Sequence, residues 1–166
     1  MITALDHIHL YAADPERTLR FYEDCFGAER LGALGNDHGD HNHFLLLGGQ
    51  LLVVSAFPPD IEPADPPEVG DGARRAGFGV AHFGLQTADL AGVVAKLERA
   101  GVDVHSAPRG EGAIRYVYFS APDGVVIELV QLVLPPKLEK LRPLFDAYNR
   151  AVHVTKRAFA KQLFRA

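Results

Sequence analysis

The sequence predicts an α+β fold: two tandem βαβββ modules form a curved mixed sheet around a cleft, followed by a C-terminal helix. Two observations carry this prediction. First, the segment LDHIHLYAADP at residues 5–15 is echoed by VAHFGLQTADL at residues 80–90, an offset of 75 residues that also relates Gly49 to Gly124. Second, the same order of strand, helix and turn signals follows each segment. A repeated register of this kind indicates a duplicated module.

The predicted boundaries follow from the repeat and from changes in composition. Module one spans residues 3–57 and module two spans residues 78–134, and together they form one domain over residues 1–134. A linker rich in proline, glycine and acidic residues joins them over residues 58–77. Residues 135–166 form a helical extension.

In module one, the first strand contains His7 and His9, whose side chains share one face because they are two residues apart. Asp14 is a suitable N-cap for a helix over residues 15–26, in which Pro15 takes the first helical position and Gly27 stops the helix. A further candidate strand and the hairpin HFLLL-GG-QLLVVSAF complete the module.

In module two, the strand beginning at His82 leads to Asp89, a second suitable N-cap. The run LAGVVAKLERA predicts an amphipathic helix that Gly101 ends. A candidate strand and the hairpin IRYVYFSA-PDG-VVIELVQLV follow. Apolar residues then recur at helical spacing from residue 143 to 164, which predicts an amphipathic C-terminal helix.

Composition favours a globular cytoplasmic protein with a real core. Hydrophobic residues make up 48% of the 166 residues, and neither a membrane-spanning run nor a signal-peptide pattern is evident. The single Cys25 excludes an intrachain disulfide and more often fills a core than acts as a nucleophile.

Charge is distributed unevenly along the chain. Residues 1–136 hold 9 Lys/Arg against 19 Asp/Glu, whereas residues 137–166 hold 8 against 2. An acidic body argues against nucleic acid as a partner, because phosphate contacts need clustered cations. For the basic tail, we consider three roles: packing over the cleft or on a partner subunit, lying on an anionic surface, or finishing the fold as a solvated helix. Packing within a homodimer is favoured because the apolar stripe needs a partner.

Three residues of the repeat suggest a metal site. The offset pairs His7 with His82, and it pairs Glu128 with Val53. Glu128 lies within the apolar run VVIELV, where a buried carboxylate is costly unless it is paired or binds a metal. The alternative is that the histidines are ordinary core or cleft residues and that Glu128 faces water, but the shared register favours a metal.

The segments DHIHLYAADPERTLRFYEDCFGAE and HFGLQTADLAGVVAKLERAGV, with YFSAPDGVVIELVQ, resemble the vicinal oxygen chelate superfamily, which includes glyoxalase I, methylmalonyl-CoA epimerase, fosfomycin-resistance thiol transferases and extradiol dioxygenases. The resemblance covers about residues 3–133 and implies metal ligands at His7, His82 and Glu128. The fourth ligand of glyoxalase I and the epimerases is missing, because Val53 or Ser55 stands at that position.

A set of two histidines and one carboxylate with open coordination positions suits Fe(II) or Mn(II), with Zn(II) or Ni(II) as alternatives. The resemblance then implies an enzyme acting on a small oxygen-rich substrate chelated to the metal, as a lyase, isomerase or related catalyst. One alternative is an extradiol ring-cleaving dioxygenase. Another is a metal-free protein that binds and sequesters a small molecule such as a drug.

Further candidates for catalytic groups are His9, Tyr118 and His43, besides Glu128. His9 shares the face of His7 and is a candidate for orienting a ligand, exchanging a proton or binding substrate, with a packed cleft residue as the alternative. Tyr118 aligns with an aromatic position that is frequent in the family. The offset equates His43 with Tyr118 and His41 with Tyr116.

Two more groups complete the list of candidates. His38 lies in the polar stretch NDHGDHNH and is interpreted as part of a solvated loop. Arg109 and Arg115 are candidates for holding an anionic group of the substrate, with an ordinary surface position as the alternative.

Overall fold

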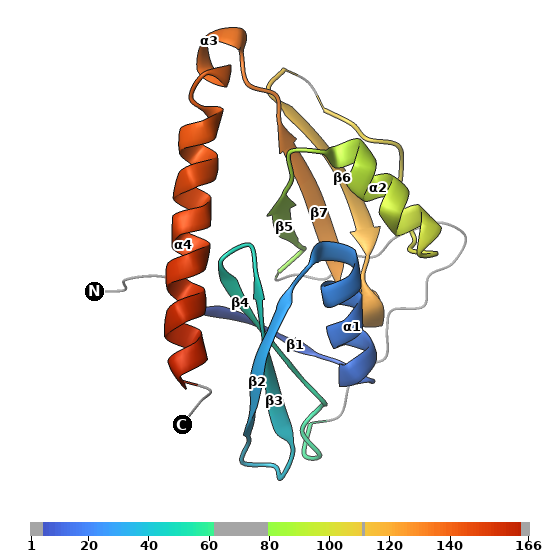
Figure 1. Ribbon diagram of the computed structural model, residues 1–166. Helices are drawn as coiled ribbons and strands as arrows, with labels where there is room; N and C mark the ends of the chain where they lie inside the picture. Colours follow the sequence, from blue (N-terminus) through green and yellow to red (C-terminus); the bar gives the residue numbers. More distant parts are fainter. Residues whose placement is uncertain (1–4, 62–79, 111, 164–166) are drawn as a thin grey trace. The chain divides into compact units, whose positions relative to one another are not determined.

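The computed structural model describes residues 5–61, 80–110 and 112–163. Two compact units are present among these residues: unit 1 comprises residues 5–61 and 136–163, and unit 2 comprises residues 80–110 and 112–135. The positions of the two units relative to each other are not determined, so each unit is described separately (Figure 1). Most of the predicted linker, residues 62–77, lies outside the described residues.

Unit 1 is built on a four-stranded mixed sheet. Its strands are β1 (His7–Tyr11), β2 (Glu29–Gly35), β3 (His41–Leu47) and β4 (Gln50–Ser55), in the spatial order β1-β4-β3-β2. β1 runs parallel to β4, and β3 is antiparallel to both of its neighbours. Gly48 and Gly49, with φ of 57° and 80°, form the two-residue turn between β3 and β4, a conformation that favours glycine.

Helix α1 (Pro15–Phe26) covers one face of this sheet. The Asp14 side chain accepts a hydrogen bond from the Arg17 amide at 3.0 Å, and Gly27 ends the helix with φ of 68°, as the sequence predicts. The core between helix and sheet contains fully buried side chains from both, namely Leu19, Tyr22, Leu45, Leu52 and Val54.

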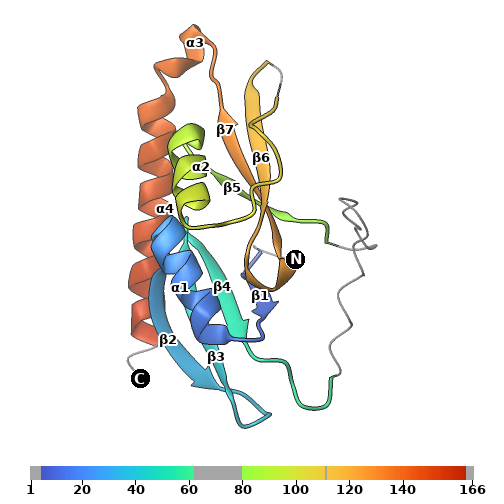
Figure 2. The same cartoon turned by 90° about the vertical axis from the view of Figure 1, so that its right-hand side faces the viewer.

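Helix α4 (Arg142–Leu163), preceded by the short α3 (Pro136–Glu139), lies on the side of the sheet opposite α1 (Figures 1 and 2). Its His153 backbone approaches the β3–β4 turn so closely that a Cβ on Gly49 would lie 3.5 Å from the His153 Cα. Glu29 of β2 pairs with Arg157 and with Lys161, the latter at 2.7 Å. The predicted C-terminal helix is confirmed, and it packs on module one of its own chain.

Unit 2 repeats the arrangement with three strands. They are β5 (Phe83–Gln86), β6 (Ile114–Ser120) and β7 (Val126–Leu132), in the order β5-β7-β6, with α2 (Leu90–Arg99) as the crossover helix. Asp89 caps α2 by accepting a hydrogen bond from the Gly92 amide at 2.9 Å. The helix ends one residue before the predicted run.

The strand expected between α2 and β6 is reduced to two isolated bridges, Val104 with Phe119 and Arg109 with Tyr116. Its sequence explains the reduction. Pro108 lacks an amide hydrogen for the ladder, and Gly110 has a φ of 134° that interrupts an extended strand. The segment nevertheless lies along the edge of β6, which preserves the order of a βαβββ module.

The two hairpins differ in length, which corrects one expectation. In unit 1 a two-residue turn separates the paired Leu47 and Gln50. In unit 2 the 3-10 turn η1 (Pro122–Gly124) makes the connection one residue longer. Phe44 therefore pairs with Val53 as Tyr118 pairs with Glu128. The constant offset that equated His43 with Tyr118 is wrong by one residue in this strand, and the same shift equates Asn42, not His41, with Tyr116.

Among the helices that the structure describes, none combines the length and apolar character needed to cross a membrane.

Candidate metal centre

In unit 2, the repeat brings His82 and Glu128 together. His82 directly precedes β5, Glu128 lies on the adjacent β7, and the His82 Nε2 lies 3.5 Å from the Glu128 Oε2. The side chains are 33% and 21% exposed, so the pair is reachable from solvent. Gly84 pairs with Glu128, and a Cβ there would lie 3.8 Å from the carboxylate. The glycine leaves the space beside the carboxylate open.

Tyr118 completes this cluster from the other side of β7. Its partner in the β6–β7 ladder is Glu128, and burial together with a hydrogen bond to the Glu128 carboxylate raises the pKa of the Tyr118 phenol. The ring centroids of Tyr118 and His82 are 5.1 Å apart at an interplanar angle of 70°, and the Tyr116 ring lies 5.7 Å from that of Tyr118. The structure thus places three predicted site residues, His82, Tyr118 and Glu128, in one cluster.

In unit 1, His7 and His9 share one face of β1, and their ring centroids are 6.4 Å apart. The Nδ1 of His7 lies 2.8 Å from the Asp6 carboxylate. A carboxylate that accepts a hydrogen bond from one imidazole nitrogen orients the ring and leaves the other nitrogen available to a metal. His7 is therefore arranged as a ligand that would bind through Nε2.

His9 has a different partner. Its Nε2 lies 2.9 Å from the Ser55 hydroxyl oxygen, and that hydroxyl donates to the Ala56 carbonyl at 3.0 Å. Because the serine proton is used there, His9 donates through Nε2 and keeps a lone pair on Nδ1. Burial, followed by the charge of His7, lowers the pKa of His9 and favours this neutral form.

The position at which the sequence analysis looked for a fourth ligand holds Val53. Val53 pairs with His9 as Glu128 pairs with Gly84, so Val53 occupies the position equivalent to Glu128. Its side chain is buried and has no donor atom. Ser55 is already hydrogen-bonded to His9.

His43 and His41 lie on the other face of the unit 1 sheet. His43 pairs with Val54, whereas the face of His7 and His9 carries Val53 and Ser55. His43 also contributes to the lowered pKa of Glu16 on α1, which is due first to the hydrogen bond from Arg30. The structure does not bring His43 together with His7 and His9. His38 lies in the loop before β3, 3.6 Å from Asp60.

Sequence reasoning missed His105. This side chain is only 10% exposed, and its Nε2 lies 2.8 Å from the Ser120 hydroxyl oxygen. The amide of His105 donates to the Tyr118 carbonyl at 2.9 Å, which places His105 beside Tyr118 on the edge of the unit 2 sheet. The repeat contains no signal for it, because the constant offset maps it onto Arg30.

The donor set in unit 2 fits a divalent ion. Imidazole and carboxylate donors bind such ions at about 2.0–2.2 Å, so two ligand atoms 3.5 Å apart can share one ion. Within the described residues, no group of three or more His, Cys, Asp or Glu side chains is arranged to hold a metal. His82 and Glu128 are two of the three predicted ligands. The third, His7, belongs to the other unit.

The comparisons with known proteins point in one direction. Residues 4–129 match the model of the Glyoxalase/Bleomycin resistance protein/Dioxygenase superfamily. A putative lactoylglutathione lyase from Brassica oleracea var. gemmifera is 26% identical over 96% of the chain, and the chain spans only 55% of that relative. The fosfomycin resistance protein FosX of Listeria monocytogenes is 24% identical, over 84% of this chain and 98% of FosX.

Solved structures of FosX from L. monocytogenes share the fold. The complex with Mn(II) and sulfate has a TM-score of 0.57 at 21% identity, over 83% of this chain and 99% of FosX. A FosX variant in complex with Mn(II) and 1S,2S-dihydroxypropylphosphonic acid has a TM-score of 0.56 at 20% identity, over 84% and 98% of the two chains.

Proposed function

Because this chain belongs to the Glyoxalase/Bleomycin resistance protein/Dioxygenase superfamily, we propose that it is a metal-dependent enzyme acting on a small, oxygen-rich substrate. His7, His82 and Glu128 would hold one divalent ion. The reaction class is a lyase, isomerase or related conversion. The observation that carries this proposal is the cluster of His82, Glu128 and Tyr118 in unit 2.

Two features of the donor set support the metal ligands. The Asp6–His7 hydrogen bond leaves the His7 Nε2 free, and the Glu128 Oε2 lies 3.5 Å from the His82 Nε2. A mixture of imidazole and carboxylate donors favours Fe(II) or Mn(II), with Zn(II) or Ni(II) as alternatives. Mn(II) is the metal present in the FosX complexes.

A divalent ion with open positions would bind two neighbouring oxygens of a substrate and polarise a carbonyl. The protein's own groups would then manage protons and orientation. The neutral His9, with its Nδ1 lone pair, is suited to accept a proton or a hydrogen bond from the substrate. Tyr118 and Tyr116 provide aromatic faces beside Glu128. Of the earlier catalytic candidates, His43 is the least supported, because it lies on the α1 face of its sheet.

The test is a metal analysis of protein purified without a polyhistidine tag. We expect the purified chain to bind about one equivalent of Mn(II) or Fe(II), and His7→Ala, His82→Ala and Glu128→Ala each to lose most of it. His43→Ala and His38→Ala are the matched controls and should keep the wild-type metal content. If all three ligand variants retain the wild-type content, the proposed site is wrong.

The same preparation separates the alternatives. Visible absorbance after anaerobic Fe(II) loading and exposure to catechol and air would instead identify ring cleavage. Small-molecule binding that survives a chelator would identify a metal-free sequestering protein.

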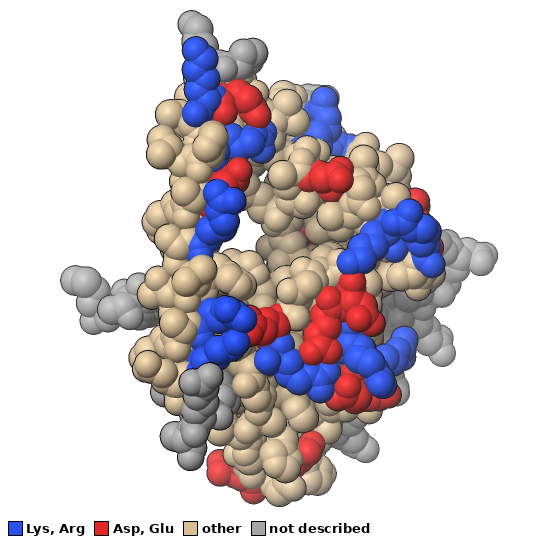
Figure 3. All heavy atoms as spheres, viewed as in Figure 1, with Lys and Arg blue, Asp and Glu red and all other residues tan. Residues whose placement is uncertain are grey.

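We also propose that the chain functions as a homodimer in the cytoplasm, with small molecules rather than nucleic acid or membranes as its ligands. Helix α4 carries exposed apolar side chains, including Leu144, Phe145 and Tyr148. Lys and Arg side chains gather along the same helix (Figure 3). A second copy is the favoured partner, because its acidic residues 1–136 complement the basic residues 137–166. The single, buried Cys25 agrees with a reducing compartment.

A further inference from the structure

The start of strand β1 is held by a side chain of the neighbouring strand. The β1–β4 ladder begins where His7 pairs with Leu51, so Leu5 and Asp6 precede the ladder. Their carbonyls are nevertheless hydrogen-bonded. The Nε2 of Gln50, the first residue of β4, donates to the Asp6 carbonyl at 2.5 Å and to the Leu5 carbonyl at 3.3 Å. The Gln50 amide therefore replaces the ladder for two residues at a strand end that would otherwise fray.

These hydrogen bonds lie one residue from a proposed metal ligand. The Asp6 carboxylate accepts the hydrogen bond that orients the His7 ring, at 2.8 Å from Nδ1. Its side chain is 83% exposed, so burial does not fix its position. A metal ligand is oriented only as well as the group that holds it. By fixing the Asp6 backbone, Gln50 limits the positions from which this carboxylate reaches His7.

The partners of the Gln50 amide also fix its orientation. Its Oε1 lies 3.4 Å from the Nζ of Lys156 on α4. A lysine ammonium only donates and a backbone carbonyl only accepts, so the two ends of the amide cannot be exchanged. Among the residues that the structure describes, no carboxylate pairs with Lys156, so an ion pair does not compete with Gln50 for this ammonium.

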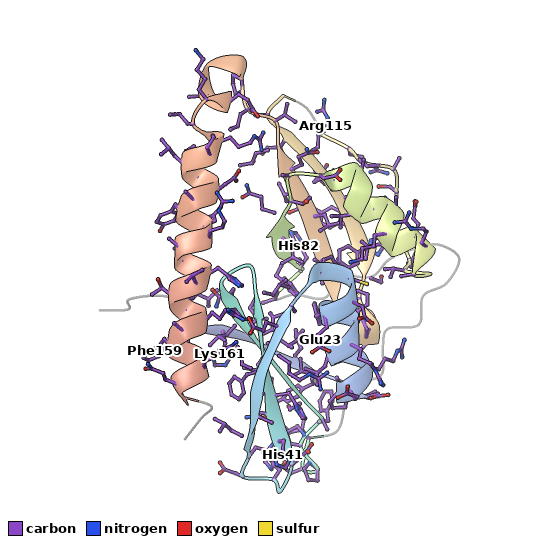
Figure 4. All side chains as sticks on the ribbon, viewed as in Figure 1. Glu23, His41, His82, Arg115, Phe159 and Lys161 are labelled. Atoms are coloured by element: carbon purple, nitrogen blue, oxygen red, sulfur yellow. The ribbon has the colours of Figure 1, made fainter. Side chains whose placement is uncertain are left out.

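Helix α4 keeps Lys156 at this end of the unit 1 sheet through contacts before and after it. Gly49, in the β3–β4 turn, lies so close to the helix that a Cβ there would be 3.5 Å from the His153 Cα. Further along α4, Lys161 pairs with Glu29 at 2.7 Å and lies on the side of the helix nearest the strands (Figure 4). Lys156 lies between these two contacts, so its position does not depend on the Gln50 amide alone.

We propose that Gln50 is a positioning residue of the metal centre and that α4 supports it through Lys156. Gln50 holds the strand start that carries Asp6 and His7, and the C-terminal helix thereby raises the affinity of the site for its metal. The superfamily match covers residues 4–129, so this support comes from a segment outside the matched region. The inference rests on the proposed function for the role of His7 as a ligand, whereas the hydrogen bonds of Gln50 belong to the metal-free chain.

The first test is the tautomer of the His7 ring in the chelator-treated, full-length chain, measured from the imidazole ¹⁵N chemical shifts at about pH 8.5, where an ordinary imidazole is neutral. We expect the Nδ1–H form in the wild type, because Asp6 accepts from Nδ1. Gln50→Met, which keeps the side-chain length and loses the amide, should lower the fraction of that form. Gln131→Met is the matched control and should not change it, because Gln131 donates its Nε2 to the Ala88 carbonyl in unit 2, at 2.6 Å.

The second test is the affinity for Mn(II), measured by isothermal titration calorimetry. We expect Gln50→Met to weaken binding about fivefold, as the loss of an ordinary hydrogen bond would do, and Gln131→Met to bind as the wild type does. Lys156→Met should weaken binding about threefold, because a charged donor to the amide is lost. Lys161→Met is its control and should keep the wild-type affinity, since Lys161 attaches α4 through Glu29.

A double variant tests whether Lys156 acts through Gln50. In the Gln50→Met background, Lys156→Met should cause no further loss of affinity, because two residues that act through one contact are not additive. Equal losses in the two backgrounds would overturn the role of α4. A wild-type tautomer of His7 in Gln50→Met would overturn the positioning role of Gln50. A wild-type chain that binds no Mn(II) would instead overturn the proposed metal site, and the His7 tautomer would still decide the role of Gln50.

Discussion

Individual side chains show how far the repeat alone could predict the site. The offset paired His82 with His7 and Glu128 with Val53, and the structure brings His82 and Glu128 to 3.5 Å with Tyr118 beside them. This succeeded because the first and last strands of a module are parallel neighbours, so a constant offset preserves their register. It failed for His43, because a turn of different length intervenes between β3 and β4. His105 was beyond reach, since its position depends on an edge segment that pairs only at isolated points.

At the same scale, Tyr118→Phe tests the role of the phenol. Tyr118 faces Glu128 across the β6–β7 ladder, so removing its hydroxyl takes a hydrogen-bond donor from beside the proposed ligand, and we expect the affinity for Mn(II) to fall about tenfold, in the range usual for groups that orient metal ligands. Tyr116→Phe, whose ring lies on the same face one step further along β6, should bind Mn(II) as the wild type does. Isothermal titration calorimetry measures both. Equal affinities in the two variants would contradict the assigned role of Tyr118.

The helices were the most predictable elements. The start and end of α1 could be derived from Asp14, Pro15 and Gly27, because capping depends on local side chains. The second strand of module two was not predictable in the same way. Pro108 and Gly110 limit the pairing of this segment with β6 to two isolated bridges. Its formation therefore depends on contacts with β6 and not on local sequence signals. The choice of partner for α4 also lay outside local sequence signals.

The attachment of α4 to β2 predicts a pH dependence. Hydrogen bonds from Arg157 and Lys161 lower the pKa of Glu29 to about 2. Since the ordinary value is about 4.5, the carboxylate stabilises the packing of α4 fully above about pH 4.5 and loses this effect as the pH falls toward 2. Because the pair is exposed, the contribution is about 1 kcal/mol or less.

Hydrogen exchange of α4 amides, corrected for intrinsic rates, measures this attachment. Protection should decrease by up to about fivefold between pH 5.5 and pH 3, which corresponds to that free energy. Glu29→Gln should show the reduced protection already at pH 5.5 and little further change on acidification. Glu98→Gln, at an exposed position on α2, is the control. Wild-type protection in Glu29→Gln at pH 5.5 would show that other contacts hold α4.

At the scale of the whole molecule, the predicted α+β fold with two modules and a C-terminal helix is confirmed. The repeat could predict this because each module carries its own start, stop and turn signals. The single domain over residues 1–134 and the cleft between the modules stay predictions. The proposed third ligand, His7, depends on that arrangement, which is why no local pattern could complete the site.

The face of α4 that points away from the unit 1 sheet predicts an assembly. Figure 4 shows Phe159 on the outer side of α4 and Lys161 on the side of the strands. Phe159 is 64% exposed, and Leu144 and Tyr148 are 66% and 68% exposed. Exposed apolar side chains of this size on one helix are typical of an interface with another chain.

We expect light scattering after size exclusion to give the mass of a dimer for the wild type and that of a monomer for the double variant Leu144→Glu with Tyr148→Glu. Asn149→Glu, which adds one charge at an exposed position on another side of the same helix, should remain dimeric. A monomeric wild type would exclude the homodimer.

The unequal hairpin turns have an evolutionary consequence. A strand exchanges its two sets of side chains when its register moves by one residue, so one codon gained or lost in a turn can replace every group that a strand presents to a site. In this chain the one-residue difference makes Phe44 equivalent to Tyr118, and His43 equivalent to Val117. The site of a duplicated half can therefore change without point mutations of its own residues. A deletion in a loop is enough to present a different set of side chains to the site.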